Sequence, residues 1–295
     1  MKKKEKRLVK QQALEWLQFR EKSVTKSSFA TYQYVIRKHI IPNVGDCDVN
    51  DAETARRILL EMSKGYRDVT RSGIMTVFNS IMRFNSDSGS KSKRVKINCD
   101  EKTDIIPKDQ FAMFMVEVRT DINPTKLGIL CVIYTGIKIS ELCSLKWKNV
   151  DLVNNVIKVD KNVQRIYLNN EDKKTVLDEK DIPIRYIPIP TKLLRILLSR
   201  VGRLDDYLIT GNSKQVEPRT AQNRLFALCR KTGLSTKITY QKLRDYFAIN
   251  ALVNNVNAIV VADILGLEFD MMQKYLEVAQ NLIDMENEIE KLNHI

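Results

Sequence analysis

The stretch TGIKISELCSLKW, residues 135–147, joins a turn, an apolar helical pattern and a lysine within thirteen positions. Its Thr-Gly pair breaks a helix, and Ile137, Ile139 and Leu142 mark a buried face of the helix that we expect to run to the end of the stretch. Lys138 stands between the two isoleucines. Because an unpaired ammonium group is costly to bury, Lys138 needs an anionic partner or a route to solvent.

The chain is strongly basic, and its charge is unevenly distributed. Lys and Arg number 49 against 36 Asp and Glu, a formal net charge of +13. Residues 1–100 hold 21 basic against 11 acidic side chains, residues 101–275 hold 27 against 20, and residues 276–295 hold one against five. Two basic blocks before an acidic tail favour a polyanionic partner such as double-stranded DNA or RNA. A lysine-rich solubilising surface is the alternative.

Length and composition exclude several other classes of protein. A chain of 295 residues with 43% apolar side chains is typical of a globular protein of one large or two ordinary domains. Its apolar runs fall well short of the ~20 residues that a bilayer span needs, and the basic start lacks the apolar core of a signal peptide. We therefore expect no membrane association.

The histidine and cysteine content argues against metal or disulfide chemistry. Two histidines, His39 and His294, are too few for a multi-histidine metal site, so we expect no metal and no cofactor. The five cysteines are odd in number and have no CxxC spacing. This pattern indicates a reduced, cytoplasmic setting.

Hydrophobic periodicity predicts a mainly α protein with a small antiparallel β-sheet. Four helices are expected before residue 85, the second ended by Pro42, Asn43 and Gly45, and NSDSGSKSKRVKINCD (85–100) has the composition of a linker. Three extended pieces are expected at NVIKVD, NVQRIYL and IRYIPIP, with NNEDKK as a turn. Helices are expected at 107–119, 124–135, 191–202, 218–232, 239–253, 256–265 and from about 268 to the end.

A second stretch completes a joint pattern with the first. It is YQKLRDYFAINALVNNVNAIVVADILGLEFDMMQKYLEV, residues 240–278. Together with RYIP in IRYIPIP, the two resemble the catalytic domain of the tyrosine recombinase (phage integrase) family. That family carries TG-x-R-x-S-E-L-x-x-L-x-W, then R-x-I-P, then H-x-L-R-H-x-F-A, then L-G-H and a following tyrosine. The resemblance covers residues 103–276.

The resemblance implies a domain plan. Residues 1–86 resemble the family's N-terminal helical core-binding (SAM-like) domain, and 87–102 form a basic linker. Residues 103–276 correspond to the recombinase catalytic-domain fold. The acidic segment 277–295 is expected to be a helical tail.

The resemblance also implies a chemistry. In the family a tyrosine hydroxyl attacks a DNA phosphate and forms a phosphotyrosine link. Two arginines hold the phosphate oxygens, a lysine on the small sheet protonates the leaving oxygen, and histidine-type residues assist proton transfer. The matching positions retain the tyrosine as Tyr275 and the second arginine as Arg244, and Lys180 is nearest to the sheet lysine.

Three family positions carry other residues in this sequence. Lys138 replaces the arginine of the TG turn, Gln241 replaces the first histidine of H-x-L-R-H, and Leu267 replaces the histidine of L-G-H. Lysine keeps the charge but lacks the planar fork that grips two oxygens. Glutamine is no base near neutral pH, and leucine donates no hydrogen bond. We therefore expect the catalytic set to be vestigial, whereas DNA binding rests on many interchangeable phosphate contacts and persists.

Polar and basic side chains at predicted helix starts and in the linker are the candidate DNA contacts. Arginine, glutamine and asparagine read base edges, and helix N-termini favour phosphate. Besides Lys138 and Arg244, the candidates are Arg67, Thr70, Arg71, Ser72, Lys91, Lys93, Arg94, Lys96, Arg219, Gln222, Asn223 and Arg224.

The C-terminal segment carries a narrow apolar stripe on an acidic helix. Its members are spaced alternately by four and three, and they are Val278, Leu282, Met285, Ile289 and Leu292. A stripe of this kind favours a homodimer or higher oligomer through the C-terminal helix. Packing of the same stripe on its own domain is the alternative.

These observations lead to three functional hypotheses. The first is a sequence-specific DNA-binding regulator on a recombinase scaffold, for instance a repressor of a phage or mobile element, located in the cytoplasm with the nucleoid. The second is an active site-specific recombinase that works through a phosphotyrosine at Tyr275. The third is an accessory protein that bends DNA for another recombinase.

Overall fold

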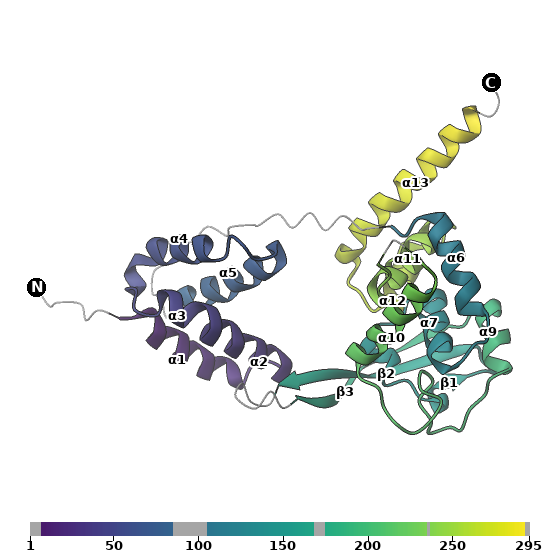
Figure 1. Ribbon diagram of the computed structural model, residues 1–295, viewed down its shortest axis with the longest axis horizontal. Coiled ribbons are helices and arrows are strands. Elements are labelled where there is room, and N and C mark those ends of the chain that lie inside the picture. Colours follow the sequence, from purple (N-terminus) through teal and green to yellow (C-terminus); the bar gives the residue numbers. More distant parts are fainter. Residues whose placement is uncertain (1–6, 85–104, 168–174, 235–236, 293–295) are drawn as a thin grey trace, which may run out of the picture. The chain divides into compact units, whose positions relative to one another are not determined.

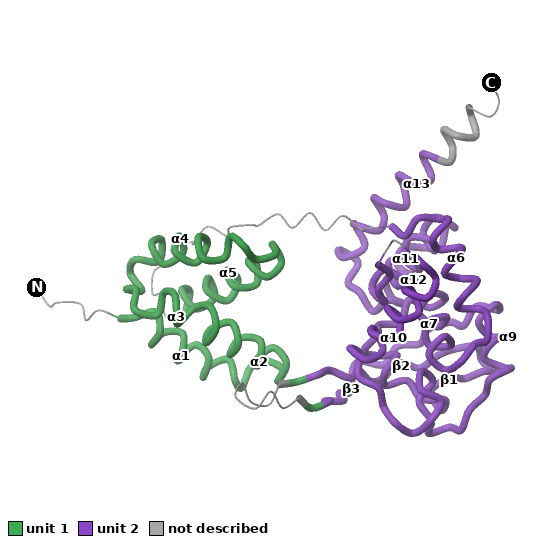
Figure 2. Tube along the Cα trace, viewed as in Figure 1, with its two compact units in different colours: residues 1–101, 166–176 green, residues 102–165, 177–295 purple. Residues whose placement is uncertain are grey.

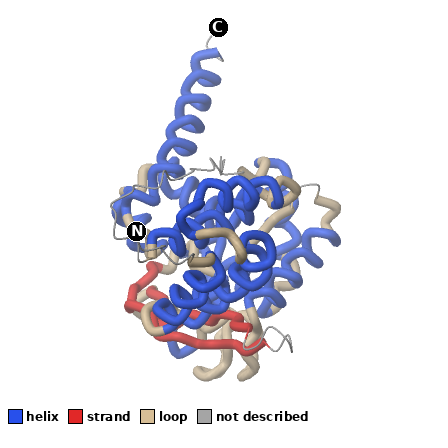
Figure 3. The backbone as a smooth tube through the Cα atoms, turned by 90° about the vertical axis from the view of Figure 1, so that its left-hand side faces the viewer, coloured by secondary structure: helices blue, strands red, loops and turns tan. Residues whose placement is uncertain are grey.

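The computed structural model describes residues 7–84, 105–167, 175–234 and 237–292 (Figure 1). It divides into two compact units, residues 1–101 with 166–176 and residues 102–165 with 177–295 (Figure 2). Helices dominate, and one three-stranded sheet is present among the described residues (Figure 3). The predicted fold class is confirmed.

The first unit is a small helical bundle with its own core. Trp16, Ile36, Leu59, Ile74 and Phe78 are buried at its centre. Its helices are α1 (Val9–Glu21), α2 (Lys26–Val35), α3 (Ile41–Val44), α4 (Ala52–Met62) and α5 (Asp68–Arg83), with short turns η1 (Ile36–Ile40) and η2 (Val49–Asp51).

The helical segment that begins with α2 ends before Gly45, the last of the three residues predicted to end it, and continues through Pro42 and Asn43. The chain passes from α2 through the π-helical turn η1 into α3, which ends at Val44. Proline has no backbone N–H and cannot continue the ordinary bonding pattern. The wider turn accommodates it, since the N–H of Ile41 bonds to the carbonyl of Ile36, five residues back. The helix therefore continues past a residue that sequence rules treat as a stop.

The second unit is built around α7 (Pro124–Thr135), which is buried on nearly every side. A helix that is apolar all round belongs in a core. Helix α11 (Tyr240–Val253) packs between α7 and α13. The other helical elements are α6 (Lys108–Arg119), α8 (Ile139–Leu142), η3 (Trp147–Asn149), α9 (Thr191–Leu198), α10 (Pro218–Lys231), α12 (Ala258–Leu265), η4 (Phe269–Met272) and α13 (Gln273–Leu292).

In the described part of the chain the sheet has three strands, as many as the predicted extended pieces, but the bounds of the strands differ from prediction. Its order is β1 (Val150–Asp151), β2 (Val156–Tyr167) and β3 (Thr175–Pro188). β1 is antiparallel to β2, with Val150 opposite Ile157. The two pieces NVIKVD and NVQRIYL are one strand, because the Lys161–Asn162 step between them continues the extended backbone. The predicted turn NNEDKK (169–174) lies outside the described residues.

The helix that opens the motif of residues 135–147 is shorter than expected. It ends at Leu142, and the chain reaches Trp147 through a turn. The hydroxyl of Ser144 bonds the carbonyls of Glu141 and Lys161 at 2.8 and 2.9 Å. A serine that bonds backbone carbonyls competes with helical bonding and fixes the turn beside β2.

The C-terminal helix packs partly on its own unit. Val278 and Leu282 lie against the cluster of α11 and α12, whereas Met285 is exposed. The α13 helix projects from the body of the second unit (Figures 1 and 3). The side chains of Ile289 and Leu292 lie outside the described part, so the predicted oligomeric contact stays a prediction.

Among the described residues, every helix is either too short or too polar to cross a lipid bilayer. Cys47, Cys131, Cys143 and Cys229 are free thiols, and the last three are buried.

Candidate active site

Two helices of the second unit end on left-handed glycines. Gly136 follows α7 with φ of +63°, and Gly266 follows α12 with φ of +60°. This conformation closes a helix C-terminus and is easiest for glycine. The carbonyl ends of helices carry partial negative charge, so both ends attract cations.

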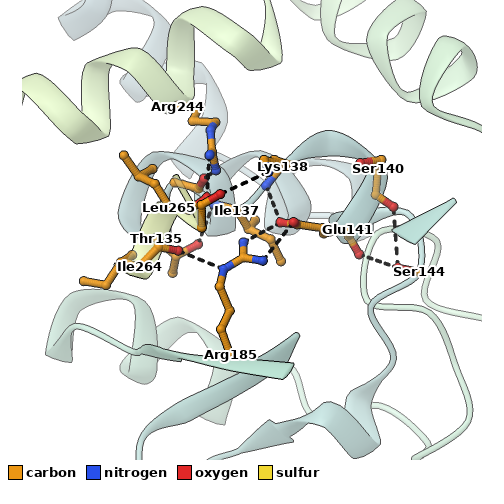
Figure 4. A network of polar contacts seen from close by, with 12 residues as sticks. Thr135, Ile137, Lys138, Ser140, Glu141, Ser144, Arg185, Arg244, Ile264 and Leu265 are labelled. Carbon is orange, nitrogen blue, oxygen red and sulfur yellow. Dashed lines mark hydrogen bonds and ion pairs between the residues drawn. The ribbon is translucent and has the colours of Figure 1, made fainter. Parts of the chain in front are cut away.

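Arg244 of α11 joins these two helix ends (Figure 4). Its guanidinium donates to the carbonyl of Gly136 and, at 2.6 Å, to the carbonyl of Leu265. The side chain is only 3% exposed, and burial is the main cause that lowers its pKa. Bonds to two helix ends compensate the buried charge and fix the position of the guanidinium.

Two further cations reach the same place from other elements (Figure 4). Arg185 of β3 donates from Nε to the carbonyl of Ile264 at 3.1 Å. Lys138, at the start of α8, places Nζ 3.5 Å from the carbonyl of Gly266. The turn after α7, the end of α12 and one strand of the sheet therefore meet at one basic cluster, which we define as Lys138, Arg185 and Arg244.

Glu141 is the buried anion of the basic cluster. Its side chain is 2% exposed and pairs in bidentate fashion with Arg185, at 2.9 and 2.6 Å. The second carboxylate oxygen also accepts the backbone N–H of Lys138 at 3.0 Å. One carboxylate thus orders the start of α8 and anchors β3 to it.

Lys138 obtains partial compensation rather than a full ion pair. Burial lowers the pKa of its ammonium, the nearby Glu141 raises it, and Arg244 and Arg185 lower it. Three cationic side chains face one carboxylate in this cluster, and the helix ends supply only partial negative charge. The arrangement favours an added anion that could accept hydrogen bonds from Lys138 and its neighbours, and a phosphate group has the required charge and oxygens.

Tyr275 of α13 packs against α11 close to Arg244, whose pKa is lowered mainly by burial and raised by Tyr275. Its ring is 1% exposed, and its hydroxyl donates to Oδ1 of Asp245 at 2.7 Å. Gln241 donates from Nε2 to the same oxygen at 2.8 Å. The structure therefore brings Gln241 and Tyr275 together through Asp245, and brings Lys138 and Arg244 together through the two glycine turns.

Lys180 and Leu267 occupy the two remaining family positions in the second unit. Lys180 on β3 pairs with Asp178 at 3.6 Å within its own strand. Leu267 follows Gly266 and packs against the apolar cluster that contains Tyr275.

The predicted DNA contacts divide by exposure. Arg67, Thr70, Arg219, Asn223 and Arg224 are exposed. Arg71 is half-buried and lies 3.8 Å from Asp68, and Ser72 is half-buried. Gln222 is engaged, since its Oε1 accepts the backbone N–H of Tyr240 at 3.2 Å. The linker residues Lys91, Lys93, Arg94 and Lys96 lie outside the described residues.

Sequence reasoning missed three residues of this site. Arg185 stands in the R-x-I-P segment, and Glu141 is the acid of ISEL. Asp245 occupies the second histidine position of H-x-L-R-H. Each of the three lies within a motif of the family, so its position in that motif is the signal that could have identified it.

Two protein-family models match this chain, one in its N-terminal part and one in its C-terminal part. A model of the phage integrase family matches residues 105–281, which is more than half of the chain. The chain belongs to the phage integrase family. A model of the phage integrase N-terminal SAM-like domain matches residues 9–55. The suspected family is confirmed.

The curated relatives of this phage integrase family member are distant. The tyrosine recombinase XerA of Thermococcus onnurineus (strain NA1) is 24% identical over 245 residues, covering 80% of this chain and 78% of the relative. A putative defective protein, IntQ, of Escherichia coli (strain K12) is 25% identical over 181 residues, covering 53% of this chain and 44% of that protein.

Solved structures support the fold. The Tn1549 transposon integrase in complex with circular intermediate DNA has a TM-score of 0.72 at 17% identity, covering 91% of this chain and 94% of that one. A lambda integrase tetramer bound to a Holliday junction has a TM-score of 0.65 at 12% identity, covering 90% and 76%. At such identities the likeness establishes the fold alone.

Gly136→Ala is expected to destabilise the second unit and displace Arg244. A Cβ at this left-handed position would lie 2.5 Å from a ring carbon of Phe247 and 2.6 Å from Cδ2 of Leu265. The strained backbone alone costs about 1–3 kcal/mol. Thermal unfolding of the variant measures the loss. Gly233→Ala is the control, because it has a similar φ of +66° but no atom within 4 Å of the added Cβ.

Proposed function

We propose that this chain is a DNA-binding regulator on the tyrosine recombinase fold, in which strand cleavage is strongly slowed. The observation that carries the proposal is the basic cluster, where three cations face a single buried carboxylate. An excess of positive charge at fixed positions suits a DNA phosphate. The net charge of +13 and the integrases that have been solved on DNA support the same partner.

Slow cleavage follows from the side chains that stand at the family's catalytic positions. Lysine at 138 offers one ammonium where the family has a bidentate fork. Tyr275 is buried with its hydroxyl bonded to a carboxylate. Loss of one donor to a charged transition state costs about 10²–10³ in rate. Binding rests on many contacts of similar strength and is far less sensitive.

An active site-specific recombinase is the second candidate. It is favoured by Arg244 and Tyr275, which keep the family's arginine and tyrosine within one domain. Recombination between two cognate sites that disappears in the Tyr275→Phe variant would establish this activity. Repression of a promoter at a bound site, unaffected by that variant, supports the regulator.

Tyr275→Phe is expected to leave the DNA dissociation constant unchanged within about twofold, because binding rests on phosphate contacts rather than on the phenol. Gel-shift titrations of genomic fragments at two stated salt concentrations measure it. The affinity of both proteins should fall steeply and in parallel as salt rises.

Denaturing gels of the same samples provide the matching test of chemistry. The regulator predicts almost no protein-linked DNA on a nicked substrate that traps cleavage. Rapid accumulation of a covalent product through Tyr275 contradicts it.

A further inference from the structure

A carboxylate on α11 holds the hydroxyl of Tyr275 inside the second unit. The phenolic O–H donates to Oδ1 of Asp245 at 2.7 Å, and the tyrosine is 1% exposed. The ring lies in an apolar cluster with Ala248, Leu252 and Met272. A tyrosine so placed must leave both the cluster and the carboxylate before its oxygen reaches a phosphate.

The carboxylate is itself held in position. Gln241, one helical turn before Asp245, donates to the same Oδ1 at 2.8 Å. Asp245 also lines a groove of about 400 Å³ between α6, α11 and α13, so solvent reaches it from one side while the tyrosine stays buried. Partial hydration allows the carboxylate to keep its charge beside a buried phenol.

We infer that Asp245 is a positioning residue that latches Tyr275 in its protonated, buried form. A hydrogen bond from a neutral O–H to a carboxylate is charge-assisted and strong. The same carboxylate repels a phenolate, so both effects of Asp245 oppose ionisation of the tyrosine. Two cations act in the other direction: Arg244, whose charge interacts with Tyr275, and Lys274, whose Nζ lies 4.7 Å from the centroid of the ring. Carboxylic acids are stronger acids than phenols by about six pKa units, so the proton stays on the tyrosine.

The latch uses the positions at which this chain departs from the family pattern. Gln241 and Asp245 stand where H-x-L-R-H has its two histidines, and Oδ1 of Asp245 accepts hydrogen bonds from both Gln241 and Tyr275. Two departures therefore act together on the retained tyrosine. The expected effect of Asp245 on DNA cleavage rests on the proposed function. The titration of the Tyr275 phenol does not, because it needs no DNA.

Titration of Tyr275 in the full chain tests the latch directly. Phenolate absorbance is followed against pH in the unchanged protein and in Asp245→Ala, and each curve is corrected by the same protein carrying Tyr275→Phe. We expect Tyr275 to ionise at a pH lower by at least about one unit in Asp245→Ala, because a repelling charge and a bond to the neutral form are lost. Asp245→Asn, which keeps the acceptor oxygen but not the charge, should fall between the two.

Asp263→Ala is the matched control. It removes an exposed carboxylate of α12 from the same unit and should not shift the titration. Thermal unfolding shows that each variant is folded. An unchanged titration of Tyr275 in folded Asp245→Ala overturns the inference.

Cleavage of a nicked, trapping duplex tests the consequence. Asp245→Ala is expected to form the Tyr275-linked product about tenfold faster than the unchanged protein, the factor that matches loss of one charge-assisted hydrogen bond. Equal or slower formation overturns the latch as a control on cleavage, and slower formation assigns Asp245 to proton acceptance instead. Failure of the unchanged protein to bind DNA overturns the proposed function, while the titration still decides the latch.

Discussion

Replacing Glu141 by alanine is expected to lower the free energy of unfolding of the second unit by about 3–5 kcal/mol. The side chain of Glu141 is 2% exposed, and that of Arg185 is 15% exposed, so the variant leaves a guanidinium without its carboxylate in a poorly hydrated place. It also removes the acceptor of the Lys138 N–H at the start of α8. Urea unfolding followed by circular dichroism measures the loss.

Two further variants decide whether burial is the cause. Asp205→Ala breaks the exposed Lys148–Asp205 pair of the same unit, which is 3.2 Å long with side chains 54% and 79% exposed, and should cost less than about 1 kcal/mol. Glu141→Leu combined with Arg185→Met removes both charges and should recover much of the stability. Equal losses in Glu141→Ala and Asp205→Ala would contradict the role given to Glu141.

Local patterns in the sequence were enough to place most helices. The prediction of 124–135 coincides with α7, because its apolar run is long and Gly136 gives an unambiguous end. The prediction of 239–253 is one residue longer than α11. Helix termini set by a glycine or by a capping side chain are encoded within a few residues, and such signals are visible in one sequence.

The predicted helix bounds were wrong where a contact made in the folded protein outweighed a local sequence signal. Pro42 signals a helix end, yet a π-helical turn continues the helix through it. Ser144 continues an apolar helical pattern, yet its hydroxyl bonds the carbonyl of Lys161, seventeen residues away. Neither outcome could be derived from periodicity, because the competing bond depends on the folded neighbourhood.

The sequence identified several residues of the site but not the groups to which their side chains bond. The motif positions Lys138 and Arg244 do meet, as the family resemblance implied. Their compensation comes from helix carbonyls, and Glu141 binds Arg185, 44 positions away. Asp245, next to Arg244 in the sequence, accepts the hydroxyl of Tyr275, thirty positions away. Pairings across such distances depend on tertiary packing.

Lys138→Arg is expected to raise the rate of covalent product formation through Tyr275 by about 10²–10³. Lys138 already lies beside Arg244 and the end of α12, so the change adds a planar fork at a place that the fold has prepared. An arginine also keeps its charge at every working pH, whereas the lysine has a lowered pKa. Single-turnover cleavage of a nicked duplex measures the rate.

Combining Lys138→Arg with Asp245→Ala distinguishes two ways in which cleavage is limited. The fork acts on charge in the transition state, whereas the latch acts on the tyrosine before attack. Free-energy contributions of residues that do not contact each other usually add, so the two rate factors should multiply apart from any coupling through Arg244, whose charge interacts with both Lys138 and Asp245. Lys138→Met is the control, since it keeps the length of the side chain but removes the charge and should slow any residual cleavage. If the double variant cleaves no faster than the better single variant, Lys138 and Asp245 limit the same step of cleavage. The basic cluster and the Asp245–Tyr275 hydrogen bond would then control cleavage together rather than independently.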